Sequence, residues 1–391
     1  MTYDVAIVGT GPDPEEKGRD GYAMAYRHAP GYERLDSCSL VACADIVEEN
    51  ARAFADRFGL DQVYGDYETM LREVEPDVVS VCVPPNVHAE IVLDCARASS
   101  VSAIHCEKPM ATTWGDCRSM VSTCEENDVQ LTIDHQRRFA APVRKAKGLL
   151  ESGEIGELRR LEWSEVNLFD AGSHLFDLCT YFTDAADVEW VLAGIDCAEE
   201  NRWFGSLNET RAIAQWKYQD GTVGFASTAE DEEATLVDAY LRLVGTEGTI
   251  EIQASDGSPL RMRTDDGWES VDTGGETVYS PSKGAIRLVT NKLARVLPRV
   301  PDDLGSVPSH YHRAIEHAVD CLEEGTEPII SGRNVLGGTE LIFAAWESVR
   351  RRGQVSLPLE VSDNPLVSMY EAGLLGETPE DHAAVPAPGG E

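Results

Sequence analysis

The stretch Tyr3-Asp-Val-Ala-Ile-Val-Gly-Thr-Gly11 decides the fold of the first third of the chain. The apolar, β-branched run 5–8 predicts a buried strand. A strand that ends in Gly-x-Gly predicts the tight turn that brings backbone close to the pyrophosphate of a dinucleotide. Gly9, Thr10 and Gly11 are therefore candidate cofactor-binding residues. Two glycines alone are a weak signal, and a plain turn after a strand would also explain them.

The third glycine of such a loop is displaced in this chain. Residues 12–20 form an insertion before Gly21, which opens the next helical pattern. We take Gly21 as the third glycine, and Gly18 is a rival for the same role. The insertion predicts a lengthened phosphate loop.

Apolar strands alternate with helical patterns as far as residue 135. The further candidate strands are 40–44, 78–83, 101–106 and 129–133, and the helical patterns include 50–58, 87–97 and 114–125. Continuous apolar strands separated by helices indicate a parallel sheet covered on both faces. Right-handed crossovers then give a doubly wound Rossmann fold. We predict an NAD(P)-binding domain at 1–135.

Polar residues follow the second and third candidate strands. Asp45 lies where a carboxylate would accept hydrogen bonds from the adenosine ribose, and its charge would repel a 2′-phosphate. NAD is thus favoured, with NADP as the alternative cofactor, unless Asp45 simply begins a turn. Pro84, Asn86 and His88 lie at the same sheet edge and are further cofactor-binding candidates. Asn86 would also be a good N-cap for the helix 87–97.

Two later motifs suggest redox chemistry at a carbinol. Glu107-Lys108-Pro109 closes a strand, and Asp170 and His174 lie four residues apart at the head of a helix beginning near Gly172. A histidine with an ordinary pKa near 6.5 suits a base that removes a hydroxyl proton as hydride leaves. A lysine ammonium can stabilise the developing alkoxide. The alternative for His174 is a solvated or capping histidine.

The helix that follows Gly172 is expected to bury one side and to present an acid–base row on the other. The buried side is an apolar stripe (Leu175, Leu178, Cys179, Phe182), and the neighbouring row is polar (Asp170, His174, Asp177, Tyr181). We predict no metal site, because hydride transfer does not need one at His174 and Asp177. His310 and His312 lie two apart at a helix start, so their rings diverge.

These motifs, in this order, resemble those of the Gfo/Idh/MocA oxidoreductases, the glucose–fructose oxidoreductase and inositol dehydrogenase group. The likeness also covers His135-Gln-Arg-Arg-Phe139, Gly153-Glu-Ile-Gly156 and Glu327-Pro-Ile-Ile-Ser-Gly332, and roughly 350 residues are spanned. The segment between Gly156 and Asp170 is shorter than in many relatives, which leaves the substrate open.

The resemblance implies the domains, the chemistry and several residue roles. It implies a second α/β domain with an open, largely antiparallel sheet that commonly serves for oligomerisation. It implies redox at a secondary carbinol of a sugar, cyclitol or related polyol. Lys108 would hold the substrate hydroxyl, His174 would be the general base, and Asp170 would bind or polarise the same site. Glu107, Lys108 and Arg138 join the cofactor-binding residues.

The rest of the chain fits this second domain, which we place at 136–360. Alternating runs at 210–218, 222–228 and 240–244 predict antiparallel strands, and helical patterns return at 309–323 and 334–352. Residues 361–391 are expected to form an acidic extension, flexible from about 378. A basic amphipathic segment at 277–301 either packs on the chain's own acidic surface, or forms a subunit contact, or, least favoured, binds a membrane or polyanion.

Composition excludes several classes of function. The chain has 391 residues and a net charge of −36, and its 33 basic residues include only seven lysines. An excess of carboxylates repels itself at low salt and is screened at high salt, which indicates a halophilic, salt-rich cytoplasm. It also argues against nucleic-acid binding. No apolar run suits a membrane span, no secretory signal is evident, and ten scattered cysteines read as reduced thiols.

The sequence therefore predicts a cytoplasmic, oligomeric NAD(P)-dependent dehydrogenase of a sugar or polyol. Two alternatives remain. One is NAD-dependent glycoside hydrolysis, in which the nicotinamide is used transiently. The other is a catalytically silent nucleotide-binding regulator.

Overall fold

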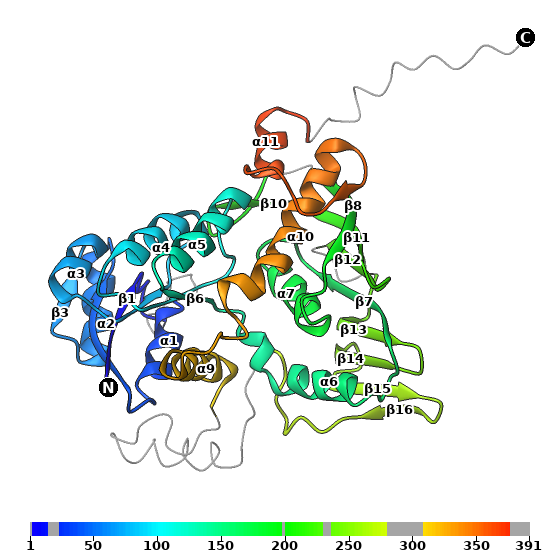
Figure 1. Ribbon diagram of the computed structural model, residues 1–391, viewed down its shortest axis with the longest axis horizontal. Coiled ribbons are helices and arrows are strands. Elements are labelled where there is room, and N and C mark those ends of the chain that lie inside the picture. Colours follow the sequence, from blue (N-terminus) through cyan, green and yellow to red (C-terminus); the bar gives the residue numbers. More distant parts are fainter. Residues whose placement is uncertain (1, 15–22, 198–199, 230–235, 280–307, 376–391) are drawn as a thin grey trace, which may run out of the picture.

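The computed structural model describes residues 2–14, 23–197, 200–229, 236–279 and 308–375. Gly18 and Gly21, the basic segment from residue 280 and the chain end from residue 376 lie outside the described residues. Two α/β units lie side by side, with α7 (Ser173–Phe182) and α10 (Gly332–Arg351) at their junction (Figure 1).

The first unit is built on a six-stranded parallel sheet in the order β3-β2-β1-β4-β5-β6. This order confirms the predicted doubly wound fold. The strands are β1 Tyr3–Val8, β2 Cys38–Ala44, β3 Gln62–Tyr64, β4 Val78–Val81, β5 Ala103–Cys106 and β6 Gln130–Ile133. Strand β3 was not predicted, because it has three residues and none of them is fully buried.

Helices cover both faces of this sheet. They are α1 Ala25–Tyr32, α2 Glu48–Phe58, α3 Tyr67–Val74, α4 His88–Arg97 and α5 Trp114–Glu126. A late helix, α9 (His310–Glu324), packs beside α1 in this same unit (Figure 1). Gly31 allows the close approach, because a Cβ there would lie 2.6 Å from Cδ1 of Ile315. The chain thus returns to the Rossmann unit after building the second sheet.

The second unit contains a nine-stranded sheet in the order β16-β15-β14-β13-β7-β12-β11-β8-β17. Among the described strands β7 and β12 are parallel, and the other neighbouring pairs are antiparallel, as predicted. The strands are β7 Leu158–Glu165, β8 Val188–Asp196, β11 Arg211–Tyr218, β12 Val223–Ala229, β13 Ala239–Gly245, β14 Thr249–Ala254, β15 Leu260–Thr264, β16 Gly267–Ser270 and β17 Val355–Ser356. Strands β9 (Asn201–Trp203) and β10 (Ser206–Asn208) form a separate ribbon.

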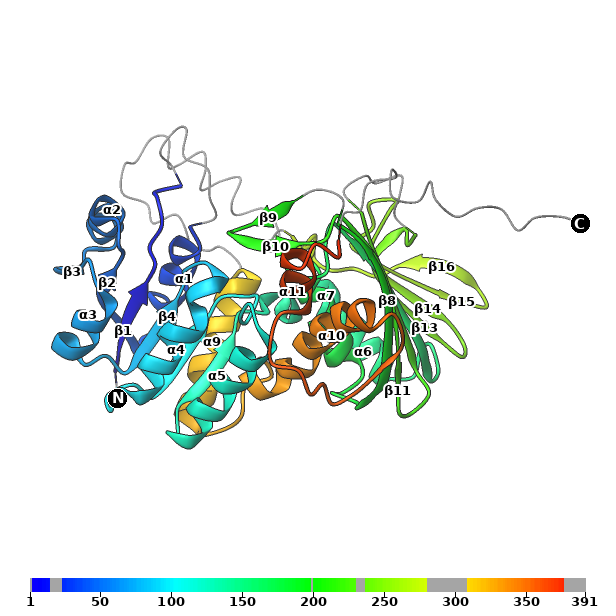
Figure 2. The same cartoon turned by 90° about the horizontal axis from the view of Figure 1, so that it is seen from above.

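Helices cover the inner face of this sheet. Figure 2 shows α6 (Ala141–Glu151), α7 and α10 between the curved sheet and the Rossmann unit. Phe176 of α7 fills the interface between Trp163 and Trp216, with ring centroids 4.9 and 5.3 Å away. The C-terminal extension begins with α11 (Pro365–Glu371), which packs on α10 and buries Leu366 and Met369.

Two local predictions were wrong. Asn86 does not cap α4: it lies exposed in a 3₁₀ turn, Pro85–Val87, and Val87 occupies the N-cap position without a side-chain hydrogen bond. Proline at the first position fixes the φ angle that this turn needs. Helix α7 is also not divided into a buried and an open side, since His174 and Asp177 are as buried as its apolar stripe.

Candidate active site

The glycine loop after β1 has the backbone that a dinucleotide requires. Gly9 and Gly11 have φ angles of 85° and 64°. A Cβ on Gly9 would lie 2.5 Å from Cγ1 of Val83, so only glycine lets the loop pack against the exit of β4. This cradle at the carboxyl edge of the sheet fits a pyrophosphate.

Asp45 faces the same loop. One carboxylate oxygen accepts hydrogen bonds from the Gly11 amide at 2.9 Å and the Thr10 hydroxyl at 3.1 Å, and the other accepts from the Val47 amide at 2.8 Å. A carboxylate offers about four acceptor positions. Asp45 therefore ties the loop to β2 and keeps capacity for a ribose hydroxyl. Its neighbour Ile46 is 93% exposed.

The candidates after β4 differ in where they lie. Pro84 and Asn86 are exposed at the sheet edge, whereas His88 is fully buried. The ring of His88 lies 2.8 Å from the Val83 carbonyl through Nε2 and 2.9 Å from the Pro109 carbonyl through Nδ1. Burial lowers its pKa. His88 thus links the exits of β4 and β5 from inside the protein.

Lys108 and Asp170 meet across the junction of the two units. The Lys108 ammonium donates to the backbone oxygen of Asp170 at 3.0 Å and lies 3.2 Å from its Oδ1. Both side chains retain some exposure, 18% and 12%. An exposed face on this ion pair leaves room for a substrate oxygen beside the ammonium. The sixty-residue separation of these motifs is closed by the packing of α7.

His174 lies in the first turn of α7 beside this pair. It is 2% exposed, and its Nδ1 has no hydrogen-bond partner within the described part of the chain. Burial, and then the positive charges of Arg137 and Lys108, hold its pKa well below the ordinary histidine value. The imidazole is therefore neutral at neutral pH and has a lone pair available for a proton.

The predicted row on α7 splits into two functions. Asp177 forms a two-armed ion pair with Arg138, with Oδ2 2.8 Å from Nε and Oδ1 2.7 Å from Nη2. Arg138 also donates to the Ile329 carbonyl at 2.6 Å and is 3% exposed. The guanidinium thus joins the segment after β6 to α7 and to the loop before α10.

Two histidines that were not predicted to be site residues lie near His174. His135 packs edge-on against it, with ring centroids 5.5 Å apart, and burial lowers the pKa of His135 to about 4. His310, at the start of α9, is likewise buried, with a pKa of about 3. In the sequence, His135 and His310 were noted only within the motif 135–139 and the pair His310/His312. Their closeness to His174 could not be predicted, because the three histidines come from three separate elements.

An arginine flanked by two tyrosines lies beside the histidines. The Arg137 guanidinium donates to the Tyr240 hydroxyl and lies 5.1 Å from the ring centres of both Tyr240 and Tyr279. Tyr240 comes from β13 and Tyr279 follows β16, so this contact forms only when the second sheet is folded. Guanidinium and phenol groups suit hydroxyl-rich ligands.

Glu107 contacts His28, a residue that was not predicted to belong to the site. Its Oε1 lies 3.0 Å from Nε2 of His28, and its Oε2 accepts from the Lys108 amide at 3.1 Å. Burial raises the pKa of Glu107. His28 comes from α1, so Rossmann packing fixes the residue that precedes the lysine.

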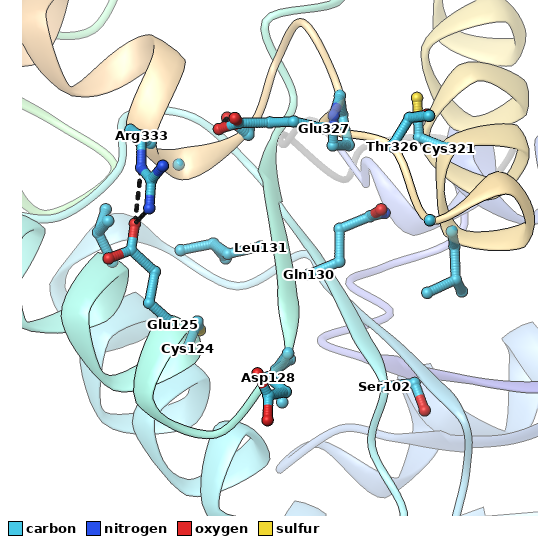
Figure 3. A pocket seen from close by; sticks show the side chains of 17 residues that line it. Ser102, Cys124, Glu125, Asp128, Gln130, Leu131, Cys321, Thr326, Glu327 and Arg333 are labelled. Atoms are coloured by element: carbon cyan, nitrogen blue, oxygen red, sulfur yellow. Dashed lines mark hydrogen bonds and ion pairs between the residues drawn. The ribbon is translucent and has the colours of Figure 1, made fainter.

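A large surface pocket of about 620 Å³ lies elsewhere (Figure 3). Ser102 and Gln130 lie at the amino ends of β5 and β6, opposite the edge that carries Lys108. Glu125 and Arg333 pair across it, with Nη2 2.7 Å from Oε1. Ligands of doubly wound sheets bind at the carboxyl edge. We therefore take the domain junction, and not this pocket, as the candidate active site.

Family models match both halves of the chain. An oxidoreductase family with an NAD-binding Rossmann fold matches residues 4–135, and its C-terminal α/β domain matches residues 159–357. The chain belongs to the Gfo/Idh/MocA oxidoreductase family. The Rossmann unit is accordingly an NAD-binding domain, as predicted. In the described residues, no helix is long and apolar enough to cross a membrane.

Similar proteins include several sugar and polyol dehydrogenases. Myo-inositol 2-dehydrogenase of Thermotoga maritima is 31% identical over 57% of this chain and 70% of its own. D-apiose dehydrogenase of Paraburkholderia graminis is 25% identical over 88% and 90%. A levoglucosan dehydrogenase solved with NADH and levoglucosan shares the fold, with a TM-score of 0.70, 18% identity and coverage of 92% and 100%.

Proposed function

We propose that this protein is an NAD-dependent dehydrogenase acting on a secondary carbinol of a sugar, cyclitol or related polyol. The observation that carries the proposal is the meeting of Lys108 and Asp170 across the domain junction, beside a buried, neutral His174. These three groups supply a hydrogen-bond donor to the carbinol oxygen, a carboxylate that orients it, and a base. Bound NAD supplies the hydride acceptor.

Each residue has a distinct task in this scheme. The Lys108 ammonium binds the substrate oxygen and stabilises negative charge on it as the proton leaves. Nδ1 or Nε2 of His174 accepts that proton, which its low pKa permits throughout the neutral range. Asp170 keeps the ammonium directed at the junction. Arg137 and Tyr240 donate hydrogen bonds to further hydroxyls of the substrate.

Asp45 favours NAD over NADP. Its carboxylate would repel a 2′-phosphate, and the exposed Ile46 beside it offers an apolar surface and no cation. Asp45→Ser should therefore narrow the preference for NAD at least tenfold in kcat/KM. Unchanged selectivity would leave Asp45 with its loop-binding role alone.

The decisive experiment compares variants at the junction. Lys108→Met and His174→Asn should each lower turnover about 10²–10⁴-fold while NAD binding is retained. Lys145→Met and His317→Asn change the same residue types outside the site and should leave turnover intact. Near-normal turnover in either junction variant rejects the assignment.

The same assay separates the two alternative functions. With polyols and glycosides at high salt, a dehydrogenase accumulates NADH, and a recycling hydrolase forms product without net NADH. A silent regulator binds NAD and turns nothing over. We expect NADH.

We further propose that the chain forms a homo-oligomer through the outer face of the nine-stranded sheet. Leu192 and Ile213 lie there on neighbouring strands and are 45% and 52% exposed. Exposed apolar clusters on sheet faces favour association. Ile213→Asp should lower the mass measured by light scattering; an unchanged mass rejects this face.

A further inference from the structure

A second cluster of ionisable side chains is buried beneath the active site. His28 from α1, His105 from β5, Glu107 after β5 and Asp134 after β6 are between 0 and 6% exposed. The side chains of His28, His105 and Asp134 offer ligand atoms that all lie within 4.8 Å of one another. The hydride-transfer scheme above uses none of these three.

Hydrogen bonds around Thr132 bear on the tautomer of His105. The Thr132 hydroxyl donates its one proton to the Ile104 carbonyl at 3.2 Å, and it lies 2.8 Å from Nδ1 of His105. When the hydroxyl donates to this carbonyl, Nδ1 carries the proton and donates it to the hydroxyl. The other nitrogen, Nε2, is then a bare lone pair in the neutral ring.

That lone pair points at another acceptor. Nε2 of His105 lies 3.6 Å from Oδ1 of Asp134, and neither atom has a hydrogen-bond partner among the described residues. Oδ2 of Asp134 lies 3.3 Å from Nε2 of His28 but forms no well-aligned hydrogen bond among the described residues. Two facing acceptors in a buried site repel each other unless a positive charge lies between them. That charge is either an extra proton or a cation.

The spacing of His28, His105 and Asp134 fits a metal ion, and Glu107 lies beside His28. Nε2 of His28 lies 3.0 Å from Oε1 of Glu107 and 3.3 Å from Oδ2 of Asp134. Ligand atoms bound tetrahedrally to zinc are about 3.3 Å from one another, given metal–ligand bonds near 2.0 Å. Two carboxylates and two neutral imidazoles also balance a divalent charge.

The surroundings of the two rings support the same reading. Nδ1 of His28 lies 2.8 Å from the Ser80 hydroxyl, as Nδ1 of His105 does from Thr132. Metal-binding histidines usually have the nitrogen away from the metal hydrogen-bonded, which orients the ring. Both Nε2 atoms are thereby aimed at Asp134.

We propose that His28, His105 and Asp134 form a closed, structural site for a zinc-like divalent cation, with Glu107, whose Oε1 lies 3.0 Å from Nε2 of His28, as its fourth ligand. The ion would join α1 to the exits of β5 and β6. Glu107 directly precedes Lys108, and Asp134 directly precedes His135, so the ion would hold the Rossmann wall of the active site in place. Four protein ligands leave no open position, so the ion binds no substrate.

Metal analysis of the intact wild-type chain tests this. After equilibration with Zn²⁺ and removal of excess ion, we expect about one zinc per chain by mass spectrometry, and a fall in Tm of several degrees after chelation that Zn²⁺ reverses. Co²⁺ in its place should give the visible absorption of a four-coordinate site. Less than a tenth of an equivalent of both metals, or a Tm that chelation does not move, overturns the proposal in favour of a proton-bridged cluster.

Variants locate the site. His105→Leu and Asp134→Asn should lose the bound metal and the response of Tm to chelator, whereas His317→Gln, on α9, should keep both. Retention of a full equivalent by His105→Leu also overturns the proposal. If these variants fail to fold, Thr132→Val provides a milder test, because it removes only the hydroxyl that orients the His105 ring. It should weaken metal binding at least tenfold, and an unchanged metal affinity counts against the site. Metal content is measured independently of turnover, so a failure of the metal proposal can be told from a failure of the proposed function.

Discussion

The ion pair between Arg138 and Asp177 should be worth far more than a surface pair, although neither residue is expected to touch the substrate. Their side chains are 4% and 2% exposed, and the two carboxylate oxygens bind two different guanidinium nitrogens. Removing one partner from a buried pair strands the other charge and costs about 3–5 kcal/mol. We therefore expect Asp177→Leu and Arg138→Met each to lower the free energy of unfolding by that amount.

The double variant should behave quite differently. Removing both charges leaves no stranded ion, so Arg138→Met/Asp177→Leu should lose only about 1–2 kcal/mol, chiefly for the hydrogen bond from Arg138 to Ile329. The coupling energy of the cycle should then exceed about 3 kcal/mol. Urea unfolding followed by tryptophan fluorescence in constant molar KCl measures all four proteins.

The pair Arg333 and Glu125 provides the matched control. It too places two guanidinium nitrogens on a carboxylate, but its side chains are 64% and 46% exposed. The same cycle there should give a coupling of about 0–1 kcal/mol, since solvent screens the charges. Single losses at Arg138 and Asp177 that add within about 0.5 kcal/mol would refute the reasoning. The double variant also tests the predicted cofactor role of Arg138: with a purely structural role, its Kd for NAD stays within a few-fold of wild type.

Three further predictions concern packing, acid and salt. Gly224→Ala should destabilise the second unit by about 1–3 kcal/mol in urea, because its Cβ would lie 1.9 Å from Cε2 of the buried Trp216, whereas Gly194→Ala, with open space around it, should not. The folded-state pKa values of His135 and His310, about 4 and 3, lie below that of an unfolded histidine, so their stabilising effect is complete above about pH 6.5 and is lost as pH falls. Each histidine should lower the free energy of unfolding by about 2 kcal/mol at pH 5 relative to neutral pH. His135→Gln and His310→Gln should therefore each reduce the fall of Tm between pH 7 and pH 5. An equally steep fall in the variants contradicts the depressed pKa values. Raising KCl to molar levels should raise Tm, because the net charge of −36 repels itself, and a constant or falling Tm would count against salt adaptation.

The sequence by itself determined the fold class and the two motifs that meet at the candidate active site. Gly9 and Gly11 followed a strand, Lys108 closed another, and His174 began a helix; these are local patterns, and the hydrophobic period and the turn chemistry report them directly. Strand β3 was not predicted because three residues are too few to show a hydrophobic period. The turn at Asn86 was not predicted because the two prolines before it favour a 3₁₀ turn over a helix N-cap.

Only the tertiary structure decided which side chains share an environment. His135 and Arg137, from one segment, and His310, from another, join His174, and Asp177 pairs with Arg138. The buried group around Asp134 comes from α1, β5 and the end of β6, separated by more than a hundred residues. Burial and neighbouring charge set the protonation of each of these groups, and both arise from packing between distant segments, which no local pattern encodes.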